Sequence, residues 1–136
     1  MRGAVPLVVA VLLGLGALVL IEQGTRQQAW LVGGLLVLTG LPLLGLARWH
    51  IGRAFAITPQ AKGLVTRGLY SRIPHPMYTF LDVALLGVVV ALRFAWLLVP
   101  WLALVGVHAW TARREARVLE RAFGDAYREY RTHTWW

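Results

Sequence analysis

Two long apolar runs near the N-terminus constrain this chain more than any other feature of its sequence. Gly3–Ile21 and Ala29–Ala47 each contain 19 residues, and neither run holds a charged side chain. At about 1.5 Å per residue, such a helix nearly matches a hydrocarbon core of about 30 Å. A cleaved signal peptide is the alternative for the first run, but Ile21-Glu22-Gln23-Gly24 lacks a small-x-small cleavage site. We therefore expect two retained membrane helices.

Two further apolar segments, Met77–Leu92 and Phe94–Trp110, are separated by Arg93 alone. A single residue cannot reverse a helix, so the turn must use neighbouring residues, and the two segments are predicted to form a tight helical hairpin. Pro100 is expected to kink the second helix of this hairpin. The sequence thus predicts one all-α integral membrane domain over residues 1–136, with four transmembrane helices.

The positions of the basic residues predict how these helices are oriented. The loop 48–76 and the tail 111–136, together with Arg2, hold twelve of the fourteen Lys and Arg residues, whereas Arg26 and Arg93 lie in the other two connections. Because basic residues concentrate on the cytoplasmic side, we expect both termini, the loop and the tail to be cytoplasmic in a protein of the cytoplasmic membrane. The net charge of +8 then indicates contact with membrane lipids, and no nucleic-acid partner is expected.

The tail from residue 111 to residue 136 continues in a helical pattern but becomes amphipathic. Gly124 is a candidate break within it. Such a helix either lies on the membrane surface or forms a lid over the loop, and the sequence leaves both positions open. Its apolar residues recur at three- and four-residue steps: Val118, Leu119, Ala122, Phe123, Ala126, Tyr127 and Tyr130.

The end of the loop holds a histidine whose backbone is restricted on both sides. His75 lies between Pro74 and Pro76, and a residue before a proline is confined to extended conformations. A fixed backbone around a polar side chain suits a binding site. It equally suits a rigid turn that starts a helix.

Asp82 is the only acidic residue within the predicted spans. It lies one helical turn beyond Tyr78 and two turns beyond His75, so the three side chains share one face. A carboxylate inside a membrane is costly unless it is paired or hydrated, which makes it a functional candidate. His108 is its expected partner, and a hydrogen bond that only locks the hairpin is the alternative.

Several kinds of site are excluded by the residues that the chain has. It contains no cysteine, which excludes disulfides and thiolate chemistry. Its four histidines are too scattered for a metal cluster, so no metal is expected, and no dinucleotide-binding, P-loop or HExxH motif is present. A proton-relay transporter would need more intramembrane ionisable groups than Asp82 and His108.

Two segments carry a recognisable pattern. The first is Leu64-Val65-Thr66-Arg67-Gly68-Leu69-Tyr70, followed by Arg72-Ile73-Pro74-His75-Pro76-Met77-Tyr78, and the second comprises Glu115, Leu119, Phe123-Gly124, Tyr127 and Tyr130. Together they resemble the loop and tail motifs of the integral-membrane methyltransferases that include isoprenylcysteine carboxyl methyltransferase and the phospholipid N-methyltransferases. The likeness covers about the C-terminal two-thirds of the chain. Two positions depart from it, because Pro74 replaces an arginine and Ala116 replaces a second glutamate.

The resemblance implies an S-adenosylmethionine-dependent enzyme that acts on a lipid-like or small-molecule acceptor. Glu115 would hold an amine or hydroxyl of the cofactor, and Arg114 its carboxylate. Carboxyl O-methylation similar to that of the isoprenylcysteine enzymes is the leading expectation, with phospholipid N-methylation and a non-catalytic membrane scaffold of the same fold as alternatives. The motifs single out no catalytic residue. The cofactor-binding residues carried over by motif are Leu64, Val65, Gly68, Tyr70, His75, Tyr78, Arg114 and Glu115.

Overall fold

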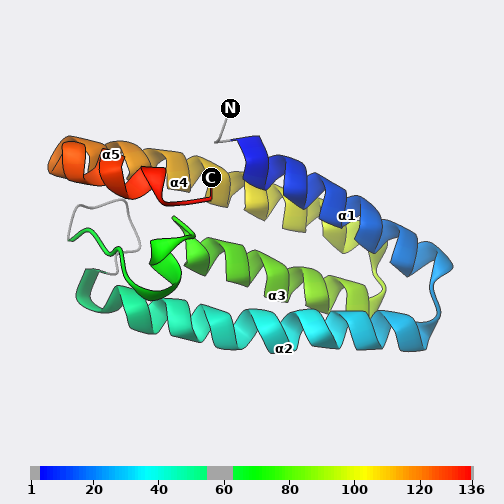
Figure 1. The fold of residues 1–136 in the computed structure, drawn as a ribbon. Coiled ribbons are helices and arrows are strands. Elements are labelled where there is room, and N and C mark those ends of the chain that lie inside the picture. The colour runs from blue at the N-terminus through cyan, green and yellow to red at the C-terminus, as the bar shows by residue number, and fades with distance from the viewer. Residues whose placement is uncertain (1–3, 55–62, 136) are drawn as a thin grey trace.

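The computed structural model describes residues 4–54 and 63–135, and these residues form helices joined by short connections. Residues 55–62 of the predicted loop lie outside the described residues. Helices α1 to α4 run side by side, and α5 folds back beside the loop that precedes α3 (Figure 1). The elements in chain order are α1 (Val5–Gln23), α2 (Arg26–Ile51), η2 (Gly52–Ala54), η3 (Gly68–Ser71), α3 (Pro76–Leu92), η4 (Ala95–Leu97), α4 (Leu98–Phe123) and α5 (Asp125–Thr132).

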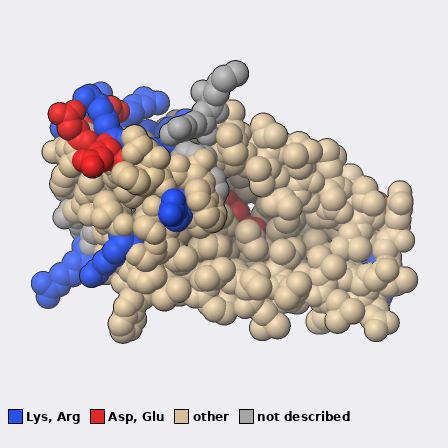
Figure 2. All heavy atoms as spheres, in the orientation of Figure 1, with Lys and Arg blue, Asp and Glu red and all other residues tan. Residues whose placement is uncertain are grey.

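Three helical segments are long and apolar enough to cross a membrane. They are α1, α2 and the continuous segment Ala95–Phe123, which joins η4 to α4. Helix α3 has 17 residues and is apolar but shorter. Charged side chains gather at the end of the molecule that holds α5, while the rest of the visible face is almost free of charge (Figure 2). The protein is therefore a membrane protein with a polar end.

Helices α2 and α3 pack closely because small residues line their interface. A Cβ atom added to Gly33 would lie 2.5 Å from the carbonyl oxygen of Gly87, and one added to Gly40 would lie 2.8 Å from the backbone nitrogen of Ala84. Membrane helices associate through such close van der Waals packing, since lipid tails are as apolar as their side chains. The α2–α3 pair is thus the tightly packed half of the bundle.

Helix α1 packs mainly against α4. Ala10, Ala17 and Ile21 of α1 belong to the same buried cluster as Trp101 and Val105 of α4. This contact also relies on a small residue, because a Cβ atom added at residue 14 of α1 would lie 3.3 Å from the indole ring. Helix α1 is therefore held by α4, and a cavity separates part of it from α3.

Arg93 ties the two turns at the apolar end of the bundle together. It ends α3 in the left-handed region, with φ of 59°. Its guanidinium group donates to the carbonyl oxygens of Gly24 and Ile21, both at 2.6 Å. As expected from the sequence, the turn uses neighbouring residues, because the chain passes Phe94 and η4 before α4 begins at Leu98.

Helix α4 combines the predicted fourth span with the first part of the predicted tail helix, and Pro100 does not interrupt it. The fourth span was expected to end at Trp110, whereas α4 continues to Phe123 and includes the first half of the predicted tail. Pro100 is the third residue of α4. The N–H groups of the first turn have no intrahelical partner, so a proline there removes no helical hydrogen bond. Gly124, with φ of 50°, ends α4 as a break.

Candidate functional site

His75, Tyr78 and Glu115 meet where α3 begins. His75 is the residue before the helix, and buried Pro76 is its first residue. The His75 Nδ1 atom lies 3.4 Å from Glu115 Oε2. The Tyr78 hydroxyl donates to the same carboxylate oxygen over 3.5 Å. One oxygen of an α4 side chain therefore joins the loop to the first turn of α3, and the two segments that the sequence motifs indicated come together here.

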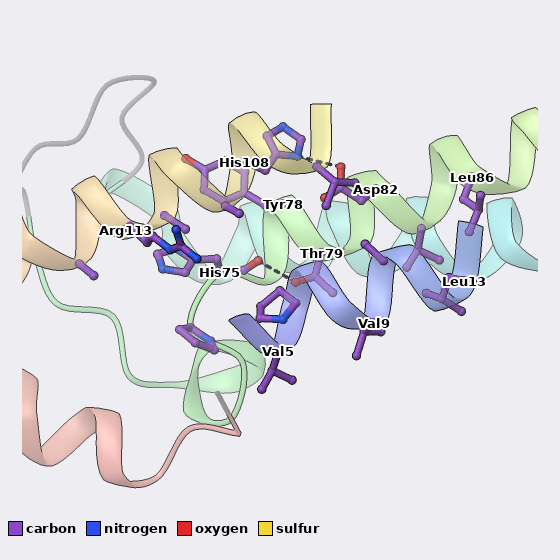
Figure 3. Close-up of a pocket in the computed structure, with 18 of the residues that line it drawn as sticks. Val5, Val9, Leu13, His75, Tyr78, Thr79, Asp82, Leu86, His108 and Arg113 are labelled. Carbon is purple, nitrogen blue, oxygen red and sulfur yellow. Dashed lines mark hydrogen bonds and ion pairs between the residues drawn. The ribbon is translucent and has the colours of Figure 1, made fainter. Parts of the chain in front are cut away.

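The ring of Tyr78 lies between two imidazole rings. Its centroid is 5.8 Å from that of His75 and 4.9 Å from that of His108, and both pairs are stacked. His108 comes from α4, so the stack crosses the α3–α4 interface (Figure 3). This arrangement fixes the orientation of all three rings, because each ring can rotate only by breaking contact with a neighbour.

Asp82 and His108 form a hydrogen-bonded pair one turn further along α3. The distance between Asp82 Oδ1 and His108 Nδ1 is 2.8 Å, and their side chains are 16% and 13% exposed. The backbone of Asp82 is held as well, since the indole N–H of Trp101 donates to its carbonyl oxygen at 2.9 Å. The partnership predicted between Asp82 and His108 is confirmed.

A cavity of about 240 Å³ lies between α1, α3 and α4 (Figure 3). Helix α1 contributes an apolar wall that includes Val5, Val9 and Leu13. Arg113 lies toward the loop, whereas Leu86 marks the opposite end of the cavity (Figure 3). Figure 2 shows a hollow in the molecular surface with an acidic group at its bottom. The polar side chains that line the cavity are His75, Tyr78, Thr79, Asp82, His108, Arg113 and Arg131.

The end of the tail is bonded to the loop. The Tyr130 hydroxyl donates to the Tyr70 carbonyl oxygen at 2.7 Å, and the Trp135 N–H donates to the Arg72 carbonyl oxygen at 2.9 Å. Burial raises the pKa of Tyr130 to about 12. Burial, followed by the nearby charge of Glu115, also raises the pKa of Tyr70. Of the two positions that the sequence left open for the tail, these hydrogen bonds favour a lid over the loop.

The loop is seated on the end of α2 through His50. The His50 Nδ1 atom accepts a hydrogen bond from the Leu69 N–H at 3.3 Å. Gly68 has φ of 60°, and a Cβ atom there would lie 2.5 Å from the imidazole ring. Gly68 is thus required by both its backbone conformation and the closeness of His50. Leu64 and Val65 are half-buried, and neither lines the cavity.

Only some of the predicted site residues line the cavity. His75 and Tyr78 line the cavity and contact Glu115, whereas Leu64, Val65, Gly68 and Tyr70 belong to the loop beside it. Arg114 is exposed, and its guanidinium carbon lies 4.7 Å above the ring of Trp110. The neighbouring residue, Arg113, is the arginine of this pair that lines the cavity.

Sequence reasoning missed several cavity residues. Arg113 extends a helix face on which Ala109, Ala112 and Ala116 recur, and this stripe of small residues was the available signal. The α1 wall and Trp101 carry no signal that separates them from lipid-facing or core residues. They enter the cavity only through tertiary packing.

Comparison with known proteins identifies a family for most of the chain. The model of the phospholipid methyltransferase family matches residues 28–126. No curated protein and no solved structure matches the chain. The matched region contains most of α2, the loop, α3 and α4, but it leaves out most of α5 and all of α1, which forms one wall of the cavity.

Proposed function

Because the chain belongs to the phospholipid methyltransferase family, we propose that it is an enzyme that transfers a methyl group from S-adenosylmethionine to a lipid acceptor. The observation that carries this proposal is the cluster in which Glu115 holds His75 and Tyr78 at the loop end of a cavity whose α1 wall is apolar. It combines polar groups suited to a cofactor with an apolar space suited to a lipid.

The residues of the cluster and the loop fit the chemistry of S-adenosylmethionine. The Glu115 carboxylate can accept hydrogen bonds from an amine or a ribose hydroxyl. The Tyr78 hydroxyl, which donates to that carboxylate, can instead bond to a polar group of the cofactor. The half-buried, partly apolar loop supplies a wall for the rest of the molecule. The residues proposed to hold the cofactor are Leu64, Val65, Gly68, Tyr70, His75, Tyr78, Arg114 and Glu115.

The bound cofactor would supply an electrophilic methyl group. The protein's own contribution is then to position the acceptor and to exclude water. The stacked rings of His75, Tyr78 and His108 supply a rigid wall for that purpose. The contact between α5 and the loop supports exclusion of water, because Tyr130 and Trp135 hold the tail against the loop.

The cavity suits one end of a lipid acceptor. Its volume of about 240 Å³ is below the roughly 300–1,000 Å³ of sites that enclose a whole small molecule. Val5, Val9 and Leu13 of its α1 wall are exposed, so an acyl chain can enter from the bilayer. Arg113 and Arg131 at the loop end suit an anionic group such as a phosphate, and the family match favours a phospholipid.

We also propose that the polar end faces the cytoplasm and that α3 is a fourth span. The α1–α2 turn and the α3–α4 turn lie at one end of the bundle, while the loop, α5 and the described ends of the chain lie at the other (Figure 1). The second end carries most of the basic residues, which supports a cytoplasmic position.

Titration of the purified protein with S-adenosylhomocysteine, the demethylated cofactor, tests the cofactor proposal. We expect saturable heat and a rise in melting temperature, and both should be reduced in Glu115→Gln. Glu129→Gln is the matched control, because Glu129 is an exposed residue of α5. Absence of binding at millimolar ligand would contradict the proposal.

A non-catalytic scaffold of the same fold is the second candidate function, and the ring stack around Tyr78 is the observation that favours it. In a scaffold these rings only lock α3 to α4. Tyr78→Leu should then lower the melting temperature without changing binding of S-adenosylhomocysteine. In an enzyme it should weaken that binding as well.

A further inference from the structure

We propose that, for an amine acceptor in a lipid headgroup, His108 is the base that removes the proton and Asp82 positions His108. This proposal rests on the proposed methyltransferase function. It assigns a role to a hydrogen-bonded pair that cofactor binding does not require, since Asp82 and His108 lie beyond Tyr78 on the side away from the loop.

Each member of the pair retains one atom available to a ligand. His108 uses Nδ1 and Asp82 uses Oδ1 for their mutual bond. Among the described residues, Nε2 of His108 and Oδ2 of Asp82 have no hydrogen-bond partner. Every fully buried side-chain nitrogen or oxygen of the described residues does have a partner, so these two atoms are not fully buried. Both atoms are therefore accessible, and both side chains line the cavity.

The pair has the arrangement of an oriented base. A carboxylate bonded to one imidazole nitrogen favours the tautomer in which that nitrogen carries the proton, which leaves the other nitrogen with its lone pair. Trp101 holds the backbone of Asp82, and Tyr78 stacks on the His108 ring. The direction of the imidazole is thus fixed by its bond to Asp82 and its stacking on Tyr78 before any acceptor arrives.

The charges around His108 favour a cationic acceptor. From α3 it faces Asp82, with Tyr78 stacked on its ring. From α1 the cavity receives only apolar residues, and the two cationic side chains, Arg113 and Arg131, come from the parts of α4 and α5 nearest the loop. A zwitterionic headgroup matches this order, with its phosphate toward the arginines and its ammonium toward Asp82.

The chemistry requires a base only for some acceptors. An ammonium group has no free lone pair, so its proton must leave first, and here it passes to His108 Nε2 to give an imidazolium paired with Asp82. The nitrogen lone pair then forms the new N–C bond, the S–C bond of S-adenosylmethionine breaks, and its electron pair stays on sulfur. The imidazolium afterwards releases its proton to water. A carboxylate acceptor already has its lone pair, and the charge of Asp82 would repel it.

The test compares two acceptors, phosphatidylethanolamine and a farnesylated cysteine carboxylate, with wild type, His108→Gln and Asp82→Asn in vesicles. Wild type is expected to methylate the amine. His108→Gln should lower that rate by about 10²–10⁴, the usual contribution of a general base, while leaving binding of S-adenosylhomocysteine within twofold. Raising the pH should restore part of the activity of this variant, because the lipid amine then loses its proton to water. Asp82→Asn should show a smaller loss with the same pH rescue.

His133→Gln is the control substitution, since His133 is an exposed histidine of the tail. The role of His108 as the base is refuted if His108→Gln and Asp82→Asn lose activity equally at every pH, or if His108→Gln keeps full activity. Methylation of the carboxylate acceptor alone would refute an amine as the acceptor group. An inactive wild type that still binds S-adenosylhomocysteine would refute this inference but leave cofactor binding intact, whereas absent binding would overturn the proposed function itself.

Discussion

The Tyr130 hydroxyl bonds to the Tyr70 carbonyl oxygen at 2.7 Å across sixty residues of sequence. This contact joins the last helix to the loop that the sequence motifs marked as a site. The loop and the tail are therefore one structural unit, although a long membrane hairpin separates them in the chain.

Removing the hydroxyl should loosen this unit. Tyr130→Phe deletes the donor and leaves the Tyr70 carbonyl oxygen unpaired, so we expect a loss of about 1 kcal/mol and faster tryptic cleavage of the tail. Limited proteolysis in detergent measures the second effect. Tyr127→Phe is the matched control, because no described residue bonds to the Tyr127 hydroxyl. Equal cleavage of the two variants would contradict the role of the bond.

The stabilisation from the same hydrogen bond should be lost at alkaline pH. Burial raises the pKa of Tyr130 to about 12 from its ordinary value of 10. Because the folded pKa is the higher one, the stabilisation is complete below pH 10 and is lost as the pH rises from 10 to about 12. Melting temperatures over this range measure the loss, which should be smaller in Tyr130→Phe. Absorbance of tyrosinate should show one fewer late-titrating group in that variant.

Replacement of Arg93, even by lysine, should lower the stability of the protein. Its guanidinium group reaches the carbonyl oxygens of Gly24 and Ile21 at once, and an ammonium group lacks this fork. We expect Arg93→Lys to cost about 2 kcal/mol, within the range for hydrogen bonds to charged groups. Unfolding of the protein in micelles by denaturant measures it. Arg26→Lys is the control, since Arg26 is an exposed cation at the same end. Equal stability of the two variants would be evidence against the clamp.

Two adjacent glycines of α2 should respond oppositely to alanine. A Cβ atom at Gly33 would meet the Gly87 carbonyl oxygen at 2.5 Å, whereas one at Gly34 meets nothing within 4 Å. Gly33→Ala should therefore cost about 1–3 kcal/mol through overpacking. Gly34→Ala should be neutral or gain up to about 1 kcal/mol from helix propensity. The same denaturant titration compares them, and a stable Gly33→Ala would mean that α2 and α3 are less closely packed.

The sequence predicts the helices better than their packing. Uninterrupted apolar runs located α1, α2 and α3 to within a few residues, because polar residues and turns mark where each apolar run begins and ends. The helical pattern beyond Trp110 was predicted, but the sequence did not show that the fourth span and the first part of the tail are one continuous helix, α4. The sequence misjudged Pro100 because the start of α4 depends on how many residues the Arg93 turn uses.

The candidate site was predictable where local chemistry is unusual. An acidic residue in an apolar helix pointed to Asp82 and then to His108, and helical spacing placed Tyr78 beside them. The wall from α1 could not be predicted, because the exposed Val5 and Val9 look like any other lipid-facing residues in the sequence. Arg113 and Arg114 differ only by a rotation of about 100° around α4, and only the packed structure shows which one reaches the cavity.

The shortness of α3 has a consequence for the depth of the site. Its 17 residues span about 26 Å, less than the roughly 30 Å hydrocarbon core of a bilayer. A short span draws the adjoining lipid surface inward or leaves its own end below that surface. With α3 as the fourth span that we propose, His75 at its start would lie at or just below the headgroups of neighbouring lipids. A lipid acceptor would meet the methyl donor without leaving its leaflet.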